Sequence, residues 1–178
     1  MLATGASIDV SMVFLRIVHI VTGVIWVGSL FVVVVFVQPS AAALGPAGAP
    51  FMSELRRRRF VDVVFIDALF TVVVGSFLYW RDWHTYPSFG DWIGSSFGAS
   101  LTVGALLAIA GLVVAAGFTR PTIGRLVTLG KQVAGSGGTL PESAAQIGAL
   151  QRRLVVAERV SFSLVLLAVV AMASARYL

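Results

Sequence analysis

A histidine inside an apolar segment is the feature of this sequence most able to support chemistry. His19 lies in the stretch LRIVHIVTGVIWVGS, residues 15–29, and the chain has only two histidines. One helix face would carry Met12, Arg16, His19 and Gly23, which are four, three and four residues apart. Imidazole nitrogen and thioether sulfur are ligands of haem iron and of copper(I). The pattern therefore indicates a haem or copper site centred on His19.

For a b-type haem, the surrounding residues are expected to come from the outer ends of the apolar segments. His19 is expected as the axial ligand, with Met172 of the last segment, or no protein ligand, on the opposite side, because helix rise gives the two residues similar depths. Arginines would meet the propionates, and helical glycines would leave room for the flat macrocycle. The residues expected around a haem are His19, Met172, Arg16, Arg176, Gly23 and Gly75.

For copper, His19 and Met172 would supply nitrogen and sulfur donors, and His84 or Met12 would receive the ion at the mouth of the site. A histidine in a membrane helix can also hydrogen-bond across the bundle without any ligand. The same position could bind a small organic solute. Haem, copper, a solute and no cofactor at all remain alternatives at this point.

A second group of residues able to do chemistry lies in the other half of two apolar segments. Asp62 and Asp67 enter the second segment, and Glu158 and Arg159 enter the fourth, from the same side. Charges within a bilayer are costly and usually have partners. Asp67 and Arg159 lie about seven and five residues into their helices, so their depths match within a few Å. We expect a buried Asp67–Arg159 pair, with Asp62 and Glu158 nearby, that fixes helix register or, alternatively, relays protons or cations.

Composition requires that these residues be positioned by membrane helices. The 178-residue chain is 58% hydrophobic and 12% charged, and its mean hydropathy is +0.94. A soluble fold of this size could not bury so much apolar surface. The absence of cysteine excludes thiolate-ligated metal sites. The net charge of +5 is better explained by basic cytoplasmic loops than by a nucleic-acid partner.

Four apolar stretches are long enough to cross a bilayer as helices, which requires about 20 residues each. They cover residues 12–37, 60–80, 98–118 and 154–176. We therefore expect an all-α, integral membrane, up-down-up-down four-helix bundle that forms a single domain over residues 1–178.

The placement of basic residues predicts the orientation of this bundle. Arginines cluster at 56–59, and further basic residues lie between the third and fourth segments. By the positive-inside rule both of these links are cytoplasmic and both termini are on the outer side. Helices 3 and 4 are expected to extend into the cytoplasm as a hairpin over about 119–153, with a kink or restart at Pro121. Thr139 and Glu142 fit a capping box at the start of the last helix.

The stretch LRIVHIVTGVIWVGSLF resembles the first helix of small bacterial membrane families. These are the copper-resistance D-like domains with their related four-helix integral membrane proteins and, more distantly, the HemJ-type protoporphyrinogen oxidases. The shared pattern is a leucine-rich start followed by His19, Gly23, Trp26 and Gly28, and the closing MASARYL is similar to the ends of the four-helix relatives. The resemblance implies a bacterial inner-membrane protein of the copper-import or haem-associated type, with His19 as a ligand. The helix lysine of the HemJ-type enzymes has no counterpart, because Lys131 is the only lysine.

The sequence as a whole favours a small inner-membrane protein whose His-centred site, in the outer half of the bundle, binds b-type haem for electron transfer or redox chemistry. Copper or small-solute handling at the outer face is one alternative. A non-catalytic membrane partner, which forms a homo-oligomer or docks another membrane protein through the cytoplasmic hairpin, is the other. The sequence contains no recognisable phosphate-binding loop or nucleophile–base arrangement, so it does not decide whether the protein is an enzyme.

Overall fold

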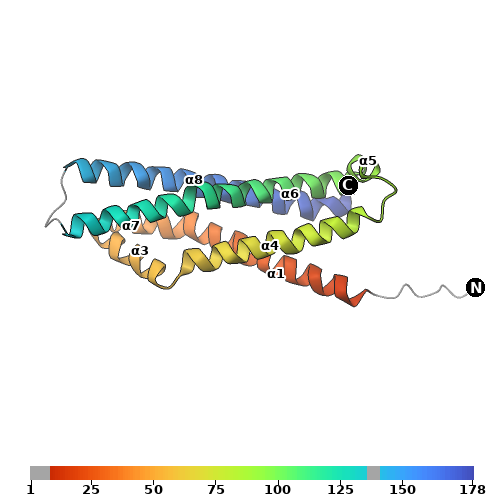
Figure 1. The fold of residues 1–178 in the computed structure, drawn as a ribbon, viewed down its shortest axis with the longest axis horizontal. Helices are drawn as coiled ribbons and strands as arrows, with labels where there is room; N and C mark the ends of the chain where they lie inside the picture. The colour runs from red at the N-terminus through yellow and green to blue at the C-terminus, as the bar shows by residue number, and fades with distance from the viewer. Residues whose placement is uncertain (1–8, 136–140) are drawn as a thin grey trace, which may run out of the picture.

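The computed structural model describes residues 9–135 and 141–178, and that part of the chain is helical, with no strand (Figure 1). Four helices are long and apolar enough to cross a membrane. They cover Val10–Ala43, Phe60–Trp83, Ser96–Gly135 and Glu142–Tyr177. Each of the predicted apolar segments lies inside one of them. The prediction of an all-helical protein with four membrane-length segments is therefore confirmed.

Two of the long helices are composite. The first joins α1 (Val10–Val32), the π-helical η1 (Val33–Val37) and α2 (Gln38–Ala43). The third joins α6 (Ser96–Val114), the π-helical η3 (Ala115–Thr119) and α7 (Arg120–Gly135). The other two long helices are α4 (Phe60–Trp83) and α8 (Pro141–Ser174). The short elements are η2 (Gly45–Ala47), α3 (Gly48–Arg57), α5 (Phe89–Gly94) and η4 (Ala175–Tyr177).

A proline follows each π-helical segment by two residues. Pro39 comes after η1 and Pro121 comes after η3. Proline has no N–H to donate, and its ring collides with the carbonyl four residues earlier. The wider π turn accommodates this mismatch, so each helix continues through its proline instead of stopping. At Pro121, where the sequence indicated a kink or a restart, the structure has a continuous helix with a local π distortion.

Small residues bring α6 and α8 close together. A Cβ at Gly104 would lie 2.6 Å from Met172 Cγ, and one at Gly111 would lie 2.7 Å from Val165 Cγ2. Ser161, which is fully buried, donates its Oγ hydrogen to the carbonyl of Gly111 at 3.0 Å. Close approach over small residues with a cross-helix hydrogen bond is how membrane helices commonly associate.

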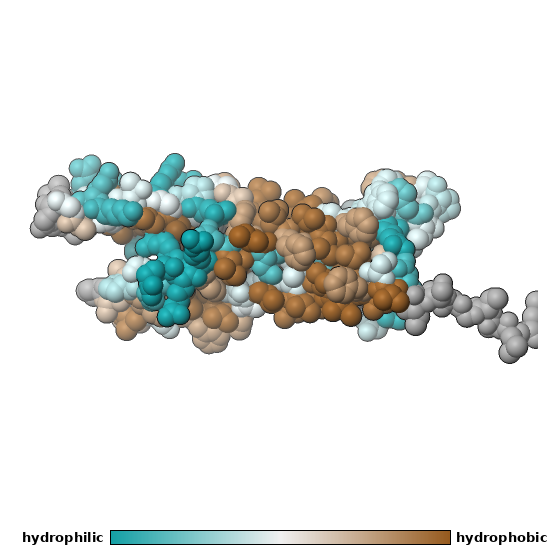
Figure 2. Space-filling model, turned by 60° about the horizontal axis from the view of Figure 1, so that its bottom comes forward, coloured by the Kyte–Doolittle hydropathy of each residue, from teal (hydrophilic) through white to brown (hydrophobic). Residues whose placement is uncertain are grey.

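The buried centre of the bundle is formed by Trp26 of α1, Ala68 of α4 and Val165 of α8. On the face that Figure 2 shows, the middle of the molecule is apolar, and hydrophilic residues gather towards both ends. A soluble monomer rarely exposes so extensive an apolar band. The band is therefore the surface that would contact lipid.

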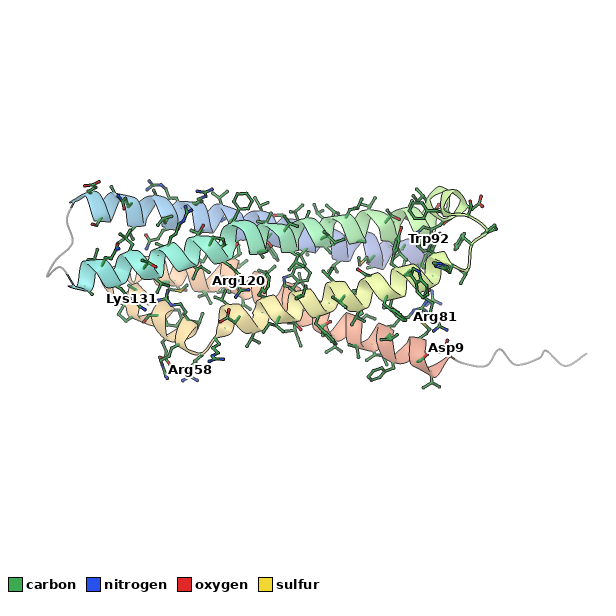
Figure 3. The ribbon with its side chains drawn as sticks, in the orientation of Figure 1. Asp9, Arg58, Arg81, Trp92, Arg120 and Lys131 are labelled. Atoms are coloured by element: carbon green, nitrogen blue, oxygen red, sulfur yellow. The ribbon has the colours of Figure 1, made fainter. Side chains whose placement is uncertain are left out.

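The two ends of the bundle differ in chemistry. We call the end that carries α3 and arginines 56–59 the basic end, and the opposite end, with α5 and the loop before it, the aromatic end (Figure 3). At the basic end Arg59 takes a left-handed conformation, φ 57°, in the turn between α3 and α4. At the aromatic end Trp92 is fully buried and makes edge contacts with Tyr79, Tyr86 and Phe97. Its indole is thus a packing centre for the loop.

Helices α7 and α8 lie side by side towards the basic end, as expected for the predicted hairpin (Figure 1). The predicted capping box of Thr139 with Glu142 involves a residue that lies outside the described part of the chain.

Candidate functional site

His19 lies on the face of α1 that packs against α4. Its Nδ1 is 3.0 Å from the backbone carbonyl oxygen of Thr71. A carbonyl oxygen can only accept, so Nδ1 carries the proton and the neutral ring has its lone pair on Nε2. Within the described part of the chain Nε2 makes no hydrogen bond, and it would lie 3.5 Å from a Cβ at Gly75. The ring is therefore oriented through one nitrogen and leaves the other available as a ligand.

The imidazole ring occupies the space that a glycine of α4 leaves. A Cβ at Gly75 would lie 2.6 Å from Cε1 of His19 and 3.0 Å from Nδ1. Gly23, one turn further along α1, faces the methyl group of Thr71, which would be 3.8 Å from a Cβ there. In this structure Gly75 thus accommodates the histidine ring itself, and not a macrocycle as expected, while a Cβ at Gly23 would be at ordinary van der Waals distance from Thr71.

Met172, the expected second ligand, packs elsewhere. Its Cγ and Cε would lie 2.6 and 3.2 Å from a Cβ at Gly104 of α6, whereas the ring of His19 contacts α4. Among the described residues no hydrogen bond joins Met172 to His19. The structure therefore does not bring the two side chains together as a ligand pair.

The arginines expected near haem propionates have different surroundings. Arg16 is more than half exposed and forms an ion pair with Asp82 of α4, with 3.2 Å between Nη2 and Oδ1. Arg176 lies exposed in η4 at the same end of the bundle. Of the two, only Arg176 has no carboxylate partner among the described residues, so it is the more available for an anion.

A second ion pair at the aromatic end joins the start of α1 to the end of α4. Asp9 caps α1 by accepting a hydrogen bond from Met12 N, and it also pairs with Arg81 (Figure 3). The hydrogen bond from Ser11, followed by that from the Met12 backbone, lowers the pKa of Asp9. This carboxylate stays charged at neutral pH and helps to hold α1 in register with α4, and thus His19 beside Thr71.

His84, the other predicted metal ligand, is held by its own helix end. Its Nδ1 donates to the carbonyl of Trp80 at 2.6 Å, and its ring centroid is 4.5 Å from that of Trp80 and 4.4 Å from that of Trp83. The described contacts of His84 are thus with the aromatic end of α4. It has none with His19.

The predicted buried pair of Asp67 and Arg159 is wrong. Arg159 is exposed and has no carboxylate partner among the described residues, and Asp67 Oδ2 is buried without any hydrogen bond. The reason is helical phase: neighbouring residues point about 100° apart, and on α8 Glu158 takes the inward position. Glu158 Oε2 is buried and unpartnered, like Asp67 Oδ2.

Asp62, expected near the same pair, instead belongs to a different contact. It binds Arg120 of α7 at 2.8 Å, and the guanidinium of Arg120 also lies 4.3 Å from the ring centroid of Phe65. Asp62 is therefore a surface link between α4 and α7, separate from the interior carboxylates.

Sequence reasoning missed Thr71 and underrated Gly75. Thr71 is buried, and its hydroxyl donates a hydrogen bond to the Asp67 carbonyl at 2.9 Å. The backbone carbonyl of Thr71 accepts the hydrogen bond from His19 Nδ1. A backbone acceptor leaves no trace in the sequence. The signal that was available is the spacing of Thr71 and Gly75, which are four residues apart on one face of α4.

These features define an all-helical protein with four helices able to cross a membrane and an oriented histidine at the contact between the first two. No protein-family model, curated protein or solved structure matches the chain. Its function is therefore argued from its own residues.

Proposed function

We propose that this is a multi-pass membrane protein in which His19 is the axial ligand of a b-type haem used for electron transfer or redox chemistry. The observation that carries the proposal is the state of the imidazole ring. Nδ1 donates to the Thr71 carbonyl, and Nε2 is left with a lone pair and no hydrogen-bond partner among the described residues. Ligating histidines characteristically donate their other ring nitrogen to a carbonyl or carboxylate in this way.

We propose fewer haem-binding residues than the sequence alone suggested. His19 would supply the iron ligand, and Arg176, which has no carboxylate partner among the described residues, would meet a propionate. Met172 packs against Gly104, so no second side-chain ligand is proposed. When bound, haem supplies a one-electron couple whose potential follows its axial ligand and surroundings.

The chain's own part in this chemistry is to orient and tune the ligand. The Thr71 carbonyl fixes the tautomer and increases the basicity of Nε2. Gly75 leaves the space that the ring occupies, with Cε1 the atom nearest to this position, and the close fit restricts the ring's rotation. The ion pair of Arg16 with Asp82 holds α1 to α4 on the side of His19 towards the aromatic end.

Haem is favoured over copper because it needs only one side-chain ligand from the protein. A copper(I) site needs two or more soft donors. The described residues contain no group of three or more His, Cys, Asp or Glu side chains able to hold a metal ion, and His84 and Met172 make their contacts away from His19. Copper handling at the outer face is therefore the second candidate.

We place the protein in the bacterial inner membrane with its basic end in the cytoplasm. The four spans then run up-down-up-down with both termini outside, because Arg56, Arg57, Arg58 and Arg59 lie at the end opposite to the loop before α5. In this orientation His19 is in the outer half of the membrane, and the α7–α8 hairpin extends into the cytoplasm, where it could dock a second copy or another membrane protein.

Titration of hemin into the detergent-purified protein tests the proposal. We expect saturable equimolar binding that His19→Ala weakens at least tenfold and His84→Ala leaves unchanged. A parallel copper(I) titration separates the two candidates. Copper binding that depends on His19, with no hemin binding, would overturn the haem assignment in favour of copper.

A further inference from the structure

Four buried side-chain oxygens without a hydrogen-bond partner lie in the half of the bundle towards the basic end. They are Gln38 Oε1, Asp67 Oδ2, Thr119 Oγ1 and Glu158 Oε2. Each comes from a different long helix. In the described part of the chain, only one other buried side-chain nitrogen or oxygen is unpartnered, the indole nitrogen of Trp92 at the aromatic end. We call these four residues the interior oxygen set.

Contacts on either side of Glu158 fix its level in the bundle. Towards the basic end, Arg153 lies over the ring of Phe118, 5.9 Å from its centroid. Towards the aromatic end, Ser161 bonds the carbonyl of Gly111. Glu158 is therefore level with the stretch of the third long helix between Gly111 and Phe118.

The level of Asp67 is bracketed in the same way. Asp62 lies five residues from Asp67 towards the basic end and forms an ion pair with Arg120. Thr71 lies four residues from Asp67 towards the aromatic end, and its carbonyl accepts a hydrogen bond from His19. Asp67 is thus at the depth of the first residues of η3 or slightly nearer the aromatic end, close to the level of Glu158.

The other two members of the set lie nearer the basic end. Thr119 is next to Phe118 and is therefore level with Arg153. Arg153 lies five residues from Glu158 towards the basic end, which is roughly 7 Å of helix rise. Gln38 is seven residues beyond Phe31, whose ring packs on Phe162 at 6.0 Å between centroids. Along the bundle axis the order from the basic end is thus Gln38 and Thr119 first, then Glu158 and Asp67.

No charged group of the described neighbouring elements neutralises the two carboxylates. Arg120 is paired with Asp62, Arg153 lies over Phe118, and Arg159 is exposed. Segments α6, η1, α2 and η3 carry no charged residue, and the cation-forming residues of α1, Arg16 and His19, lie towards the aromatic end. Arg125 and Lys131 of α7 are exposed. Each carboxylate therefore has one oxygen buried without a cation or donor, which is costly, and ionisable groups within membrane helices mark proton or ion pathways.

The two π-helical segments position the Gln38 and Thr119 members of the interior oxygen set. Gln38 directly follows η1, and Thr119 is the last residue of η3. Single π turns within α-helices occur frequently at functional sites, because they rotate the following residues relative to an uninterrupted helix. Here the π turns precede Pro39 and Pro121, and they place an amide and a hydroxyl at the basic side of the carboxylates.

We propose that the interior oxygen set is a proton entry path from the basic end to Asp67. A proton from bulk water passes Gln38 and Thr119 through water molecules that they bind, and protonates the carboxylate of Glu158. It then passes through a further bound water molecule to the carboxylate of Asp67, and Glu158 returns to its ionised form. No electron is transferred in these steps, and the proposal does not depend on a haem at His19.

Infrared spectroscopy of the full-length protein in lipid nanodiscs tests this order. We expect the carbonyl bands of two protonated carboxyl groups to grow as the pH is lowered, one removed by Glu158→Gln and the other by Asp67→Asn. Both bands should shift rapidly after transfer to D2O. Glu158→Gln should slow exchange at Asp67 at least tenfold, whereas Asp67→Asn should leave exchange at Glu158 unchanged. Asp62→Asn, which removes the exposed carboxylate paired with Arg120, should affect neither band.

Two results would overturn the path. One is exchange at Asp67 that keeps its wild-type rate in Glu158→Gln. The other is carboxyl groups that neither titrate nor exchange while the helix content stays native, which would assign them a purely structural role. Thr119→Val serves as a further variant at the entrance, and we expect it to slow exchange at both carboxyls several-fold.

Discussion

Gly75 lies directly against the imidazole of His19, so that a Cβ at this position would come within 2.6 Å of Cε1. A glycine in the middle of an apolar helix normally costs stability relative to alanine. Here it allows the ring to reach the carbonyl of Thr71 at 3.0 Å. The contact between α1 and α4 and the orientation of the candidate ligand thus depend on the same missing methyl group.

Substitution of Gly75 by alanine is therefore expected to displace the ring. The added methyl group would cost about 1–3 kcal/mol in the free energy of unfolding, as overpacking usually does, and would weaken hemin binding. Gly28→Ala in α1 is the matched control, because a Cβ there meets nothing within 4 Å. Denaturant unfolding in detergent would measure the stability change. Equal stability of the Gly75 and Gly28 variants would show that the ring does not occupy this space.

The hydroxyl of Ser161 is expected to stabilise the α6–α8 contact. Ser161→Ala removes the hydrogen bond to the Gly111 carbonyl and should lower the free energy of unfolding by about 0.6 kcal/mol, the average for such bonds in membrane proteins. Ser163→Ala changes an exposed hydroxyl on the same helix and should have no comparable effect. The two variants are compared by reversible unfolding in mixed micelles. A larger loss for Ser163 would contradict the packing of α6 on α8.

Arginine substitutions distinguish the observed charge contacts from those expected from the sequence. Arg159→Ala should change the free energy of unfolding by no more than about 0.5 kcal/mol, because the side chain is exposed and has no carboxylate partner in the described part of the chain. Arg120→Ala should cost about 1 kcal/mol, since it removes both the ion pair with Asp62 and the cation–π contact with Phe65. Thermal unfolding of the two variants checks this ranking, and the reverse order would restore the buried pair of Asp67 with Arg159.

The short helix α3 is expected to loosen in acid. Hydrogen bonds from Arg57 and then Arg58 lower the pKa of Glu54. A carboxyl whose folded pKa is depressed stabilises the fold above its unfolded pKa, about 4.3, and loses that contribution as the pH falls through the folded value. The chain has no cysteine, so Arg56→Cys offers a single labelling site for a spin probe. Its mobility should rise as the pH falls through that range, and Glu54→Gln should abolish the change. A pH response that persists in Glu54→Gln would assign it to another group.

Hydropathy alone predicted the four long helices, because a bilayer requires a length of apolar sequence that few other structures share. The facing of individual charged residues was harder to predict. Their similar depth in the membrane suggested that Asp67 pairs with Arg159. However, Glu158 lies on the buried face of α8, and Arg159 does not. The buried residues of that face are Ala157, Ser161, Val165 and Ala168. The helical spacing of these small and apolar residues, applied to the sequence, would have placed Arg159 on the exposed face of α8.

The candidate site was predicted only in part. His19 was identified because imidazole is rare and chemically distinctive in an apolar segment. Its actual acceptor is a backbone carbonyl, which every residue has, so no residue type could reveal it. Met172 was matched to His19 by depth, yet two residues at one depth can face different helices, and Met172 faces Gly104.

The role of His19 is tested most directly by a reduced-minus-oxidised absorption spectrum of the protein purified from haem-supplied cells. The wild type and His84→Ala are expected to show the difference bands of a b-type haem in equimolar amount. His19→Ala is expected to show none while retaining native helix content. A colourless wild-type protein, or a haem spectrum unchanged by His19→Ala, would contradict the assignment of His19 as the haem ligand.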